Sequence, residues 1–453
     1  MILVLFWTIF SGFAYGQEKA DISYKIIMDN PSSGIIKVVM NIGGLSQQSL
    51  ILTENASYSR MAINDLKAEN KQGNYLTVNT LQKVDKNGQK QKGRGFVIKT
   101  EGNRNITVEY NVKPGNIARH GHQGYLDARF GLVCGRNVFL FPLDYSLVEK
   151  VGVEFKLPPD WQVASPWHGK AGENNFILKE GDYKYGIRLK DILWEATLGF
   201  GRFKTRNIRV DGFDMHIYTF SDWPEKSAQT IAGHASEIMK YQLELFGINN
   251  KWEYTLIFVP KAADGGRVFG GCWALGQGFE MYPANLRNWE LLSHRMHHLF
   301  NSYEPFAMRM AERPDRWFVE ATATYFEIKA LASLGAYKLE DRLKNQLFSR
   351  YKTLRIGYDA GLSSDYKQPY KIKEYLHYIK APLVAYLMDK KITKETRQAK
   401  DLNGFLKYLY SKYGMKKGSI ENLKLELESF TGIDFNEFFK KYVDGTQALE
   451  LGN

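Results

Sequence analysis

The apolar residues of this 453-residue chain change their spacing near residue 206, and that change limits the architectures open to it. Before residue 206, apolar and polar residues alternate in short runs separated by Gly, Pro and Asn; after it, apolar residues recur every three or four positions. A period of two indicates strands with one buried face, and a period near 3.6 indicates amphipathic helices. The sequence therefore predicts a multidomain α+β protein with a β-rich first part and a helical last part.

Residues 17–205 are expected to form an N-terminal β-sandwich-like domain. In "DISYKII", Ile22, Tyr24 and Ile26 alternate with polar residues, and "VGVEFKLPPDW" repeats this pattern at Val153 and Phe155. The runs are short and end in turn-forming residues, which is typical of antiparallel strands.

Residues 206–330 are expected to form a second domain that mixes helices with a sheet. The stretch "KSAQTIAGHASEIMKYQLELFG" places Ile231, Ala235 and Ile238 at helical spacing, and Gly247 is a stop signal. The apolar run "YTLIFV" at 254–259 indicates a buried strand, and two helical segments follow it. Residues 331–453 keep the helical pattern and predict a C-terminal helical domain.

The first sixteen residues, "MILVLFWTIFSGFAYG", are uncharged, mostly apolar, and end in small residues before the polar "QEKADISYK". The run is short for a membrane span, and its end suits signal cleavage, although no basic residue follows Met1. We expect residues 1–16 to be an export signal and the protein to be secreted or periplasmic. An uncleaved signal that anchors the chain in the membrane is the alternative.

The charge balance favours acidic partners or surfaces without naming one. Lys and Arg number 61 against 49 Asp and Glu, a net charge of +12. No nucleic-acid-binding motif accompanies this charge, so we do not expect a nucleic-acid partner. The two cysteines, Cys134 and Cys272, are compatible with a disulfide in an oxidising compartment and equally with two buried thiols.

A candidate metal site lies in "LLSHRMHHLFNSY", residues 291–303, and "DRWFVEATATYFE", residues 315–327. His294 and His298 are four residues apart, so on a helix they share a face, and Glu320 follows on the next helical segment. Two histidines and one carboxylate are a ligand set that zinc accepts while keeping an open position for water. A lone pair of histidines at this spacing is weak evidence, and the adjacent His297 shows that the segment is rich in histidine.

These motifs resemble those of the gluzincin peptidases, in particular the glycyl aminopeptidase family and more distantly the aminopeptidase N family. That signature is His-Glu-x-x-His on one helix, followed on the next by Trp-x-x-Glu-Gly-x-x-x-Tyr. Here "HRMHH" and "WFVEATATY" match it at His294, His298, Trp317, Glu320 and Tyr325. "YIKAPLVAYLMD" is similar to the family's Tyr-x-Lys-Gly-Ala motif, and "TGIDFNEFFKKYVDG" is similar to the end of its helical domain.

The resemblance implies a thermolysin-like fold for residues 206–330, with the C-terminal helical domain closing a cleft. It implies that His294, His298 and Glu320 are zinc ligands and that the ligand is a peptide or protein. It also implies that Tyr378 faces the open coordination position and stabilises the oxyanion in an active enzyme.

Arg295 is the first departure from the family pattern, because it stands where the catalytic glutamate belongs. The glutamate passes a proton from the zinc-bound water to the leaving amine, and an arginine accepts no proton at working pH. At roughly 5 Å and an effective dielectric constant of about 20, repulsion between arginine and a divalent cation is on the order of 6 kcal/mol. Zinc binding is therefore expected to be weak or lost unless Arg295 pairs with a carboxylate such as Glu290 or Glu327.

The second departure lies in "DGGRVFGGCWALGQGFEMY", residues 264–282. The family places a glycine-rich edge strand there, whose backbone holds the peptide and whose glutamate captures the substrate's amino terminus. Gly270 and Gly271 match this substrate-binding strand, but Trp273 stands at the position of the glutamate. No Gly-Lys-Ser/Thr ending follows, so a phosphate-binding loop is not expected.

Together the two departures favour an exported peptidase homologue that binds zinc and peptides but cleaves them weakly or not at all. One alternative is an active zinc aminopeptidase in which Glu290, or Glu280 beside the glycine-rich strand, replaces the base. Another is a non-enzymatic protein whose basic surface and β domain bind a partner. A weaker candidate, His120 and His122 in "RHGHQG", is more typical of a surface loop than of a metal site.

Overall fold

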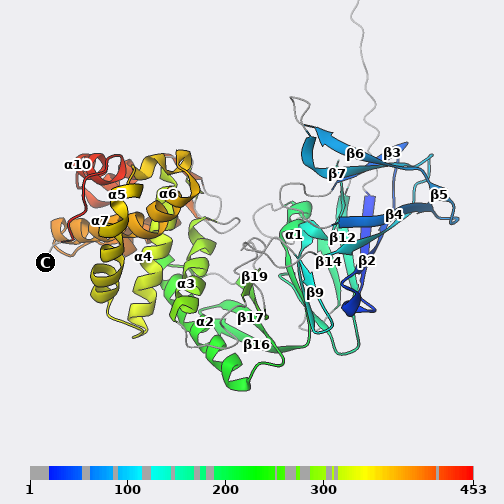
Figure 1. The fold of residues 1–453 in the computed structure, drawn as a ribbon, viewed down its shortest axis with the longest axis horizontal. Coiled ribbons are helices and arrows are strands. Elements are labelled where there is room, and N and C mark those ends of the chain that lie inside the picture. Colours follow the sequence, from blue (N-terminus) through cyan, green and yellow to red (C-terminus); the bar gives the residue numbers. More distant parts are fainter. Residues whose placement is uncertain are drawn as a thin grey trace, which may run out of the picture.

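The computed structural model describes residues 20–53, 62–84, 90–114, 124–143, 148–167, 174–179, 188–249, 252–260, 272–275, 286–302, 309–310, 315–414 and 418–451. Within them the chain is a multidomain α+β protein, with sheets at its N-terminal end and helices at its C-terminal end (Figure 1). The expected export signal, residues 1–16, lies outside the described residues and stays a prediction. In the described part of the chain, no helix has the length and apolar character that crossing a membrane requires.

Three sheets build the N-terminal region. The largest has the strand order β14-β12-β1-β2-β8-β4-β5, and two four-stranded sheets have the orders β13-β15-β10-β9 and β11-β3-β7-β6. The strands of the large sheet are β1 (Ala20–Ile27), β2 (Ile36–Ile42), β4 (Ala62–Asn70), β5 (Tyr75–Leu76), β8 (Ile106–Lys113), β12 (Val148–Lys156) and β14 (Asn175–Lys179). Those of the smaller sheets are β3 (Ser49–Thr53), β6 (Val78–Val84), β7 (Lys90–Lys99), β9 (Tyr125–Leu126), β10 (Phe130–Cys134), β11 (Phe141–Pro142), β13 (Gln162–Ala164) and β15 (Thr197–Gly201).

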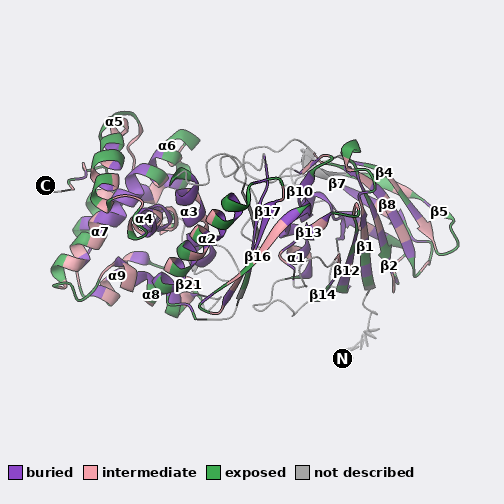
Figure 2. Ribbon diagram, turned by 90° about the horizontal axis from the view of Figure 1, so that it is seen from below, coloured by how far each residue is buried: buried purple, intermediate pink, exposed green. Residues whose placement is uncertain are grey.

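The apolar and polar residues that alternate in the sequence correspond to buried and exposed positions along these strands. Ile22, Tyr24 and Ile26 of β1 are buried, and they share one hydrophobic core with residues of all three sheets (Figure 2). The buried Tyr24 hydroxyl donates to the Leu140 carbonyl at 2.5 Å, so the core also satisfies its polar group. Most pairings are antiparallel, as expected, but β1 pairs with β12 in parallel.

The middle region combines one sheet with a long helix. Its strands, in the order β16-β17-β18-β19, are β16 (Phe203–Val210), β17 (Phe213–Phe220), β18 (Trp252–Phe258) and β19 (Cys272–Leu275). The expected helix is α2 (Glu225–Phe246), and Gly247 ends it with a left-handed φ of 67°. A glycine adopts that conformation without the steric cost that a Cβ brings, which explains the stop.

Helices make up most of the remainder. The α-helices are α1 (Leu189–Glu195), which precedes the middle sheet, then α3 (Leu286–Asn301), α4 (Trp317–Ser333), α5 (Phe348–Tyr358), α6 (Tyr370–Tyr375), α7 (Ala381–Glu395), α8 (Leu402–Tyr413), α9 (Leu423–Thr431) and α10 (Asn436–Phe438). Short 3₁₀ turns are η1 (Pro31–Ser33), η2 (Gly135–Asn137) and η6 (Leu362–Lys367), and π-helical turns are η5 (Asp341–Leu347), η7 (Leu376–Lys380) and η8 (Phe439–Val443). Two short strands, β20 (Arg309–Met310) and β21 (Ser419–Ile420), pair in parallel.

The middle sheet and the C-terminal helices share a single hydrophobic core. It joins residues of β17 and β18 to residues of α2, α3, α4, α7 and α8. The expected domain boundary at residues 330 and 331 falls inside α4, which ends at Ser333 and packs against both α3 and α7. Cys134 of β10 is a buried free thiol, and its Sγ donates to the Trp194 carbonyl at 3.4 Å.

A buried lysine ties the end of the chain to the helical region. Lys380 has no exposed surface; its Nζ lies 2.9 Å from Asp359 Oδ1 and donates to the carbonyls of Ala360 at 2.7 Å and Gly445 at 3.3 Å. Burial lowers the pKa of Lys380, while Asp359 favours the charged form. The ammonium thus links η7, the segment after α5 and the segment after η8.

Lys380→Ala is expected to lower the free energy of unfolding by about 3 kcal/mol, because it removes the nearer cation from the buried Asp359 carboxylate, which keeps Arg355 at 3.8 Å. Urea denaturation followed by circular dichroism measures the change. Lys390→Ala, at an exposed position, is the matched control. The double variant Asp359→Ala/Lys380→Ala should lose less than the sum of the two single losses, and strict additivity would contradict this account of Lys380.

Candidate functional site

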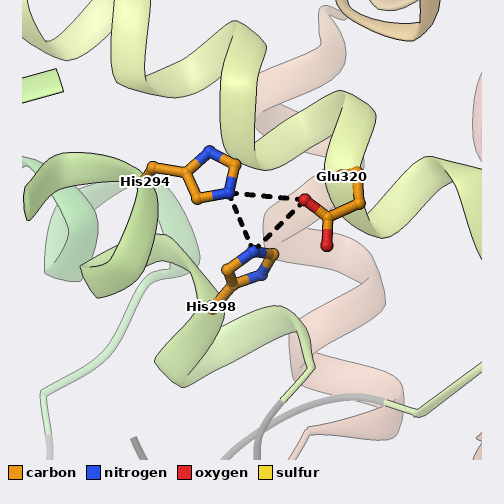
Figure 3. Close-up of side chains that lie close together, drawn as sticks. All are labelled: His294, His298 and Glu320. Atoms are coloured by element: carbon orange, nitrogen blue, oxygen red, sulfur yellow. Dashed lines mark hydrogen bonds and ion pairs between the residues drawn. The ribbon is translucent and has the colours of Figure 1, made fainter. Parts of the chain in front are cut away.

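The three residues of the expected metal site meet between α3 and α4 (Figure 3). His294 and His298 lie one turn apart on α3, and Glu320 lies in the first turn of α4. Apolar residues of both helices belong to the shared core, which fixes the two helices against each other. The polar cluster is therefore held by packing on both sides rather than by a mobile surface segment.

The ligand-type atoms of the three side chains converge on one point. His294 Nε2 and His298 Nε2 are 3.0 Å apart. Glu320 Oε2 lies 3.3 Å from His294 Nε2 and 3.5 Å from His298 Nε2. Both histidines are buried, and Glu320 is partly exposed.

Neighbouring oxygens set the orientation of both imidazole rings. His294 Nδ1 lies 2.8 Å from Glu327 Oε2, and His298 Nδ1 lies 3.0 Å from Asn301 Oδ1. The Asn301 amide cannot be reversed, because its Nδ2 donates to the Val319 carbonyl at 2.8 Å. Since both oxygens accept, each Nδ1 carries the proton, and in the neutral rings the lone pair is on Nε2, directed at the cluster.

Burial and charge act against each other in this cluster. Burial disfavours a charged His294, but Glu320 and Glu327 outweigh it and raise the pKa of His294 to about 9. Burial lowers the pKa of His298, and the charges of His294 and Arg295 lower it further, while Glu320 opposes them. Burial alone would raise the pKa of Glu320, yet His298 and His294 hold it well below its usual range. The cluster thus combines an ionised carboxylate with a His294 that favours the charged form and a His298 that favours the neutral form.

A divalent metal ion fits these residues. Within the described part of the chain, Glu320 Oε2 is buried without a well-aligned hydrogen-bond donor, and its nearest polar neighbours are the two Nε2 atoms. With both rings neutral, two lone pairs face each other 3.0 Å apart, which is unfavourable unless a cation lies beside them. Two imidazole nitrogens and one carboxylate oxygen are the donor set that zinc accepts in catalytic sites.

Arg295 is half-buried on α3, directly after His294. Its charge contributes to the lowered pKa of His298, although less than burial and the charge of His294 do. The structure therefore puts a permanent positive charge near the three ligand-type residues.

Glu290 and Glu327 have other partners within the described residues. Glu290 accepts two hydrogen bonds from Arg342 at 2.8 Å each and one from the Tyr337 hydroxyl at 3.1 Å. Glu327 is paired with His294 Nδ1, and burial raises the pKa of Glu327. Glu290 thus lies one turn before His294, as expected, but its carboxylate is bound by a guanidinium.

Tyr378 lies on the π-helical turn η7 and reaches the cluster from the C-terminal region. Its ring centroid is 5.9 Å from that of His294, and 42% of the residue is exposed. The structure thus brings Tyr378 to the same place as the three ligand-type residues.

Several other predicted residues lie outside the described residues: Gly270, Gly271, Glu280, His120 and His122. The backbone at Trp273 belongs to β19, while its side chain also lies outside the description.

Sequence reasoning missed Asn301, and it named Glu327 only as a possible partner of Arg295, not as the residue that orients His294. Asn301 follows His298 by three positions, and Glu327 follows Glu320 by seven, so both spacings place the pair on one helical face. That spacing was the available signal, but it does not say which helix face is turned toward the partner helix.

Comparisons with known proteins agree with this architecture. Residues 23–185 match the family model of the Peptidase M61 N-terminal domain. The structure of an aminopeptidase N family protein from Idiomarina loihiensis superposes with a TM-score of 0.75 at 16% identity, covering 95% of this chain and 77% of that chain. No curated protein matches the chain.

A second relative in structure is the M1 zinc metallopeptidase from Deinococcus radiodurans. It has a TM-score of 0.57 at 12% identity, covering 96% of this chain and 95% of that one. A variant of the Deinococcus enzyme, bound to a Tyr-ser-ala substrate, has a TM-score of 0.55 at 12% identity and covers 96% of this chain and 95% of its own. At these identities the likeness establishes the fold. With the family match it supports a metallopeptidase-type family, and with the His294, His298 and Glu320 cluster it suggests zinc.

Glu327→Ala is expected to weaken zinc binding about 10- to 100-fold, since His294 loses the carboxylate that orients its ring. Glu327→Gln should weaken zinc binding less, because its amide oxygen still accepts from Nδ1. Competition with a chromophoric chelator measures both affinities, and the exposed Glu437→Gln is the control. Equal zinc affinity in Glu327→Ala and the unaltered protein would contradict the ligand assignment.

Proposed function

We propose that this protein is an exported homologue of the zinc aminopeptidases, of the glycyl aminopeptidase type, that binds zinc and peptides and cleaves them weakly or not at all. The proposed zinc ligands are His294, His298 and Glu320. The observation that carries the proposal is the combination of a complete ligand cluster with the Arg295 charge beside it.

Zinc, when bound, supplies Lewis-acid polarisation of a carbonyl and a more acidic bound water. The chain's own residues must then take the proton from that water and pass it on. Arg295 cannot accept a proton, so general base catalysis at its position is lost. To Tyr378, whose ring lies 5.9 Å from that of His294, we assign the role of donating a hydrogen bond to a bound carbonyl oxygen. The residues proposed to bind zinc and to orient a peptide carbonyl are thus retained, whereas a proton acceptor at position 295 is not.

The surroundings of Glu290 argue against its use as a substitute base. A bidentate arginine fixes the position of the carboxylate. Both of its oxygens are held by Arg342, so a reorientation toward the cluster would break two hydrogen bonds. Peptide binding is supported by the substrate-bound structure of the Deinococcus homologue.

The first test measures metal content and peptide hydrolysis on one purified sample of the full chain. We expect about one zinc ion per chain by elemental analysis and no cleavage of a mixed peptide library by mass spectrometry. Arg295→Glu restores a proton acceptor beside His294, and we expect it to raise hydrolysis by about 100-fold or more over background.

Lys226→Glu, an exposed position on α2 with the same change of charge, is the matched control and should gain no activity. A second control, Arg295→Gln, removes the positive charge without adding a base. Cleavage by the unaltered protein that Arg295→Glu abolishes would overturn the proposal. Zinc absent from every preparation, with no uptake on addition, would overturn the metal assignment.

Removal of the metal is expected to lower the melting temperature by several degrees, since an ion that binds only the folded chain stabilises it. Differential scanning fluorimetry with and without a chelator measures the shift. His294→Ala/His298→Ala should melt at the same temperature in both conditions. A shift of equal size in this variant would place the stabilising metal elsewhere.

A further inference from the structure

The segment that leads to Tyr378 carries an unusual surface. We define the lysine–tyrosine face as Tyr366, Lys367, Tyr370 and Lys371, on η6 and α6. Tyr370 is 66% exposed and Tyr366 is 36% exposed, and Lys367 and Lys371 are exposed as well. α6 runs directly into η7, and the Tyr378 ring on η7 lies 5.9 Å from that of His294. The face therefore lies on the segment that leads to the cluster on α3.

Acidic residues around this face are largely turned inward. Asp365 is buried and lies 2.6 Å from His377 Nε2, and Asp359 is paired with the buried Lys380. Glu374 is the exposed acid of the segment, so three lysines and one glutamate leave residues 366–374 with a surface charge of +2. The neighbouring α5 adds Arg350, Lys352 and Arg355 and has no acidic residue.

We propose that the lysine–tyrosine face selects acidic peptides for the cluster, with carboxylates of the peptide bound by Lys367 and Lys371 and its backbone lying along Tyr370. The inference rests on the proposed peptide-binding function and names its ligand class. Exposed lysines and tyrosines suit this role because ammonium groups attract carboxylates, while tyrosine rings offer apolar area and a hydroxyl.

The geometry limits where the acidic residues of the peptide belong. Tyr370 and Tyr378 are eight residues apart on one continuous helical segment, and a rise of about 1.5 Å per residue puts them roughly 12 Å apart. An extended peptide covers that distance in about three to four residues. The acidic side chains are therefore expected about three to five residues from the peptide residue that lies at the cluster.

The test compares two fluorescently labelled peptides with free amino termini and equal length. One carries Asp or Glu at positions 3 to 5, and the other carries Asn or Gln there. Fluorescence polarisation with the zinc-loaded full chain is expected to show about tenfold tighter binding of the acidic peptide in low salt, and a smaller difference at high salt.

Lys367→Ala/Lys371→Ala should remove most of that preference without changing the affinity for the neutral peptide or the zinc content. Lys390→Ala/Lys394→Ala, at the far end of α7, is the matched control and should keep the preference. Equal binding of both peptides, unchanged by the first double substitution, would overturn this inference and leave peptide binding intact. If neither peptide binds, peptide binding itself fails, and the inference fails with it.

Discussion

The contact between α3 and α4 is the interaction on which the rest of the site depends. It places polar side chains between two helices that otherwise bury apolar ones, so each polar group needs a partner. Asn301 supplies two: its Nδ2 donates to the Val319 carbonyl on α4, and its Oδ1 accepts from His298 Nδ1. One amide thus joins the helices and also sets the tautomer of a proposed ligand. The hydrogen bonds that hold the two helices together are thus also the ones that orient the proposed ligand.

Charge balance stabilises the contact between α3 and α4, and this stabilisation does not depend on catalysis. Glu320 and Glu327 bring two carboxylates to His294, and a buried carboxylate is costly unless it is paired. Without a metal, the positive charge comes from His294, whose pKa of about 9 keeps it protonated at neutral pH. With a metal, the ion takes over that role. The histidines and Glu320 are therefore needed to balance charge between the helices both with and without a metal. A general base at position 295 would serve catalysis alone.

The sequence predicted the elements whose signal is local. Alternation at Ile22, Tyr24 and Ile26 identified β1, and periodicity with Gly247 identified α2 and its end. The parallel pairing of β1 with β12 joins segments more than a hundred residues apart, and no local pattern encodes such a pairing. The site divides in the same way. Spacing placed His294 and His298 on one helical face, and the family resemblance added Glu320, while the roles of Asn301 and Glu327 depend on which faces of α3 and α4 meet.

Tyr378 and Lys380 show why a family motif is weak evidence for activity. They are two residues apart on a helical turn, so their side chains point to nearly opposite sides. Accordingly Tyr378 is 42% exposed beside His294, and Lys380 is fully buried against Asp359. Loss of the lysine would destabilise the fold, because the buried Asp359 would lose its nearer cation. Packing can therefore preserve most of this motif whether or not the protein is active, and in the function proposed above the decisive position is Arg295, whose side chain the fold does not require to be an acid.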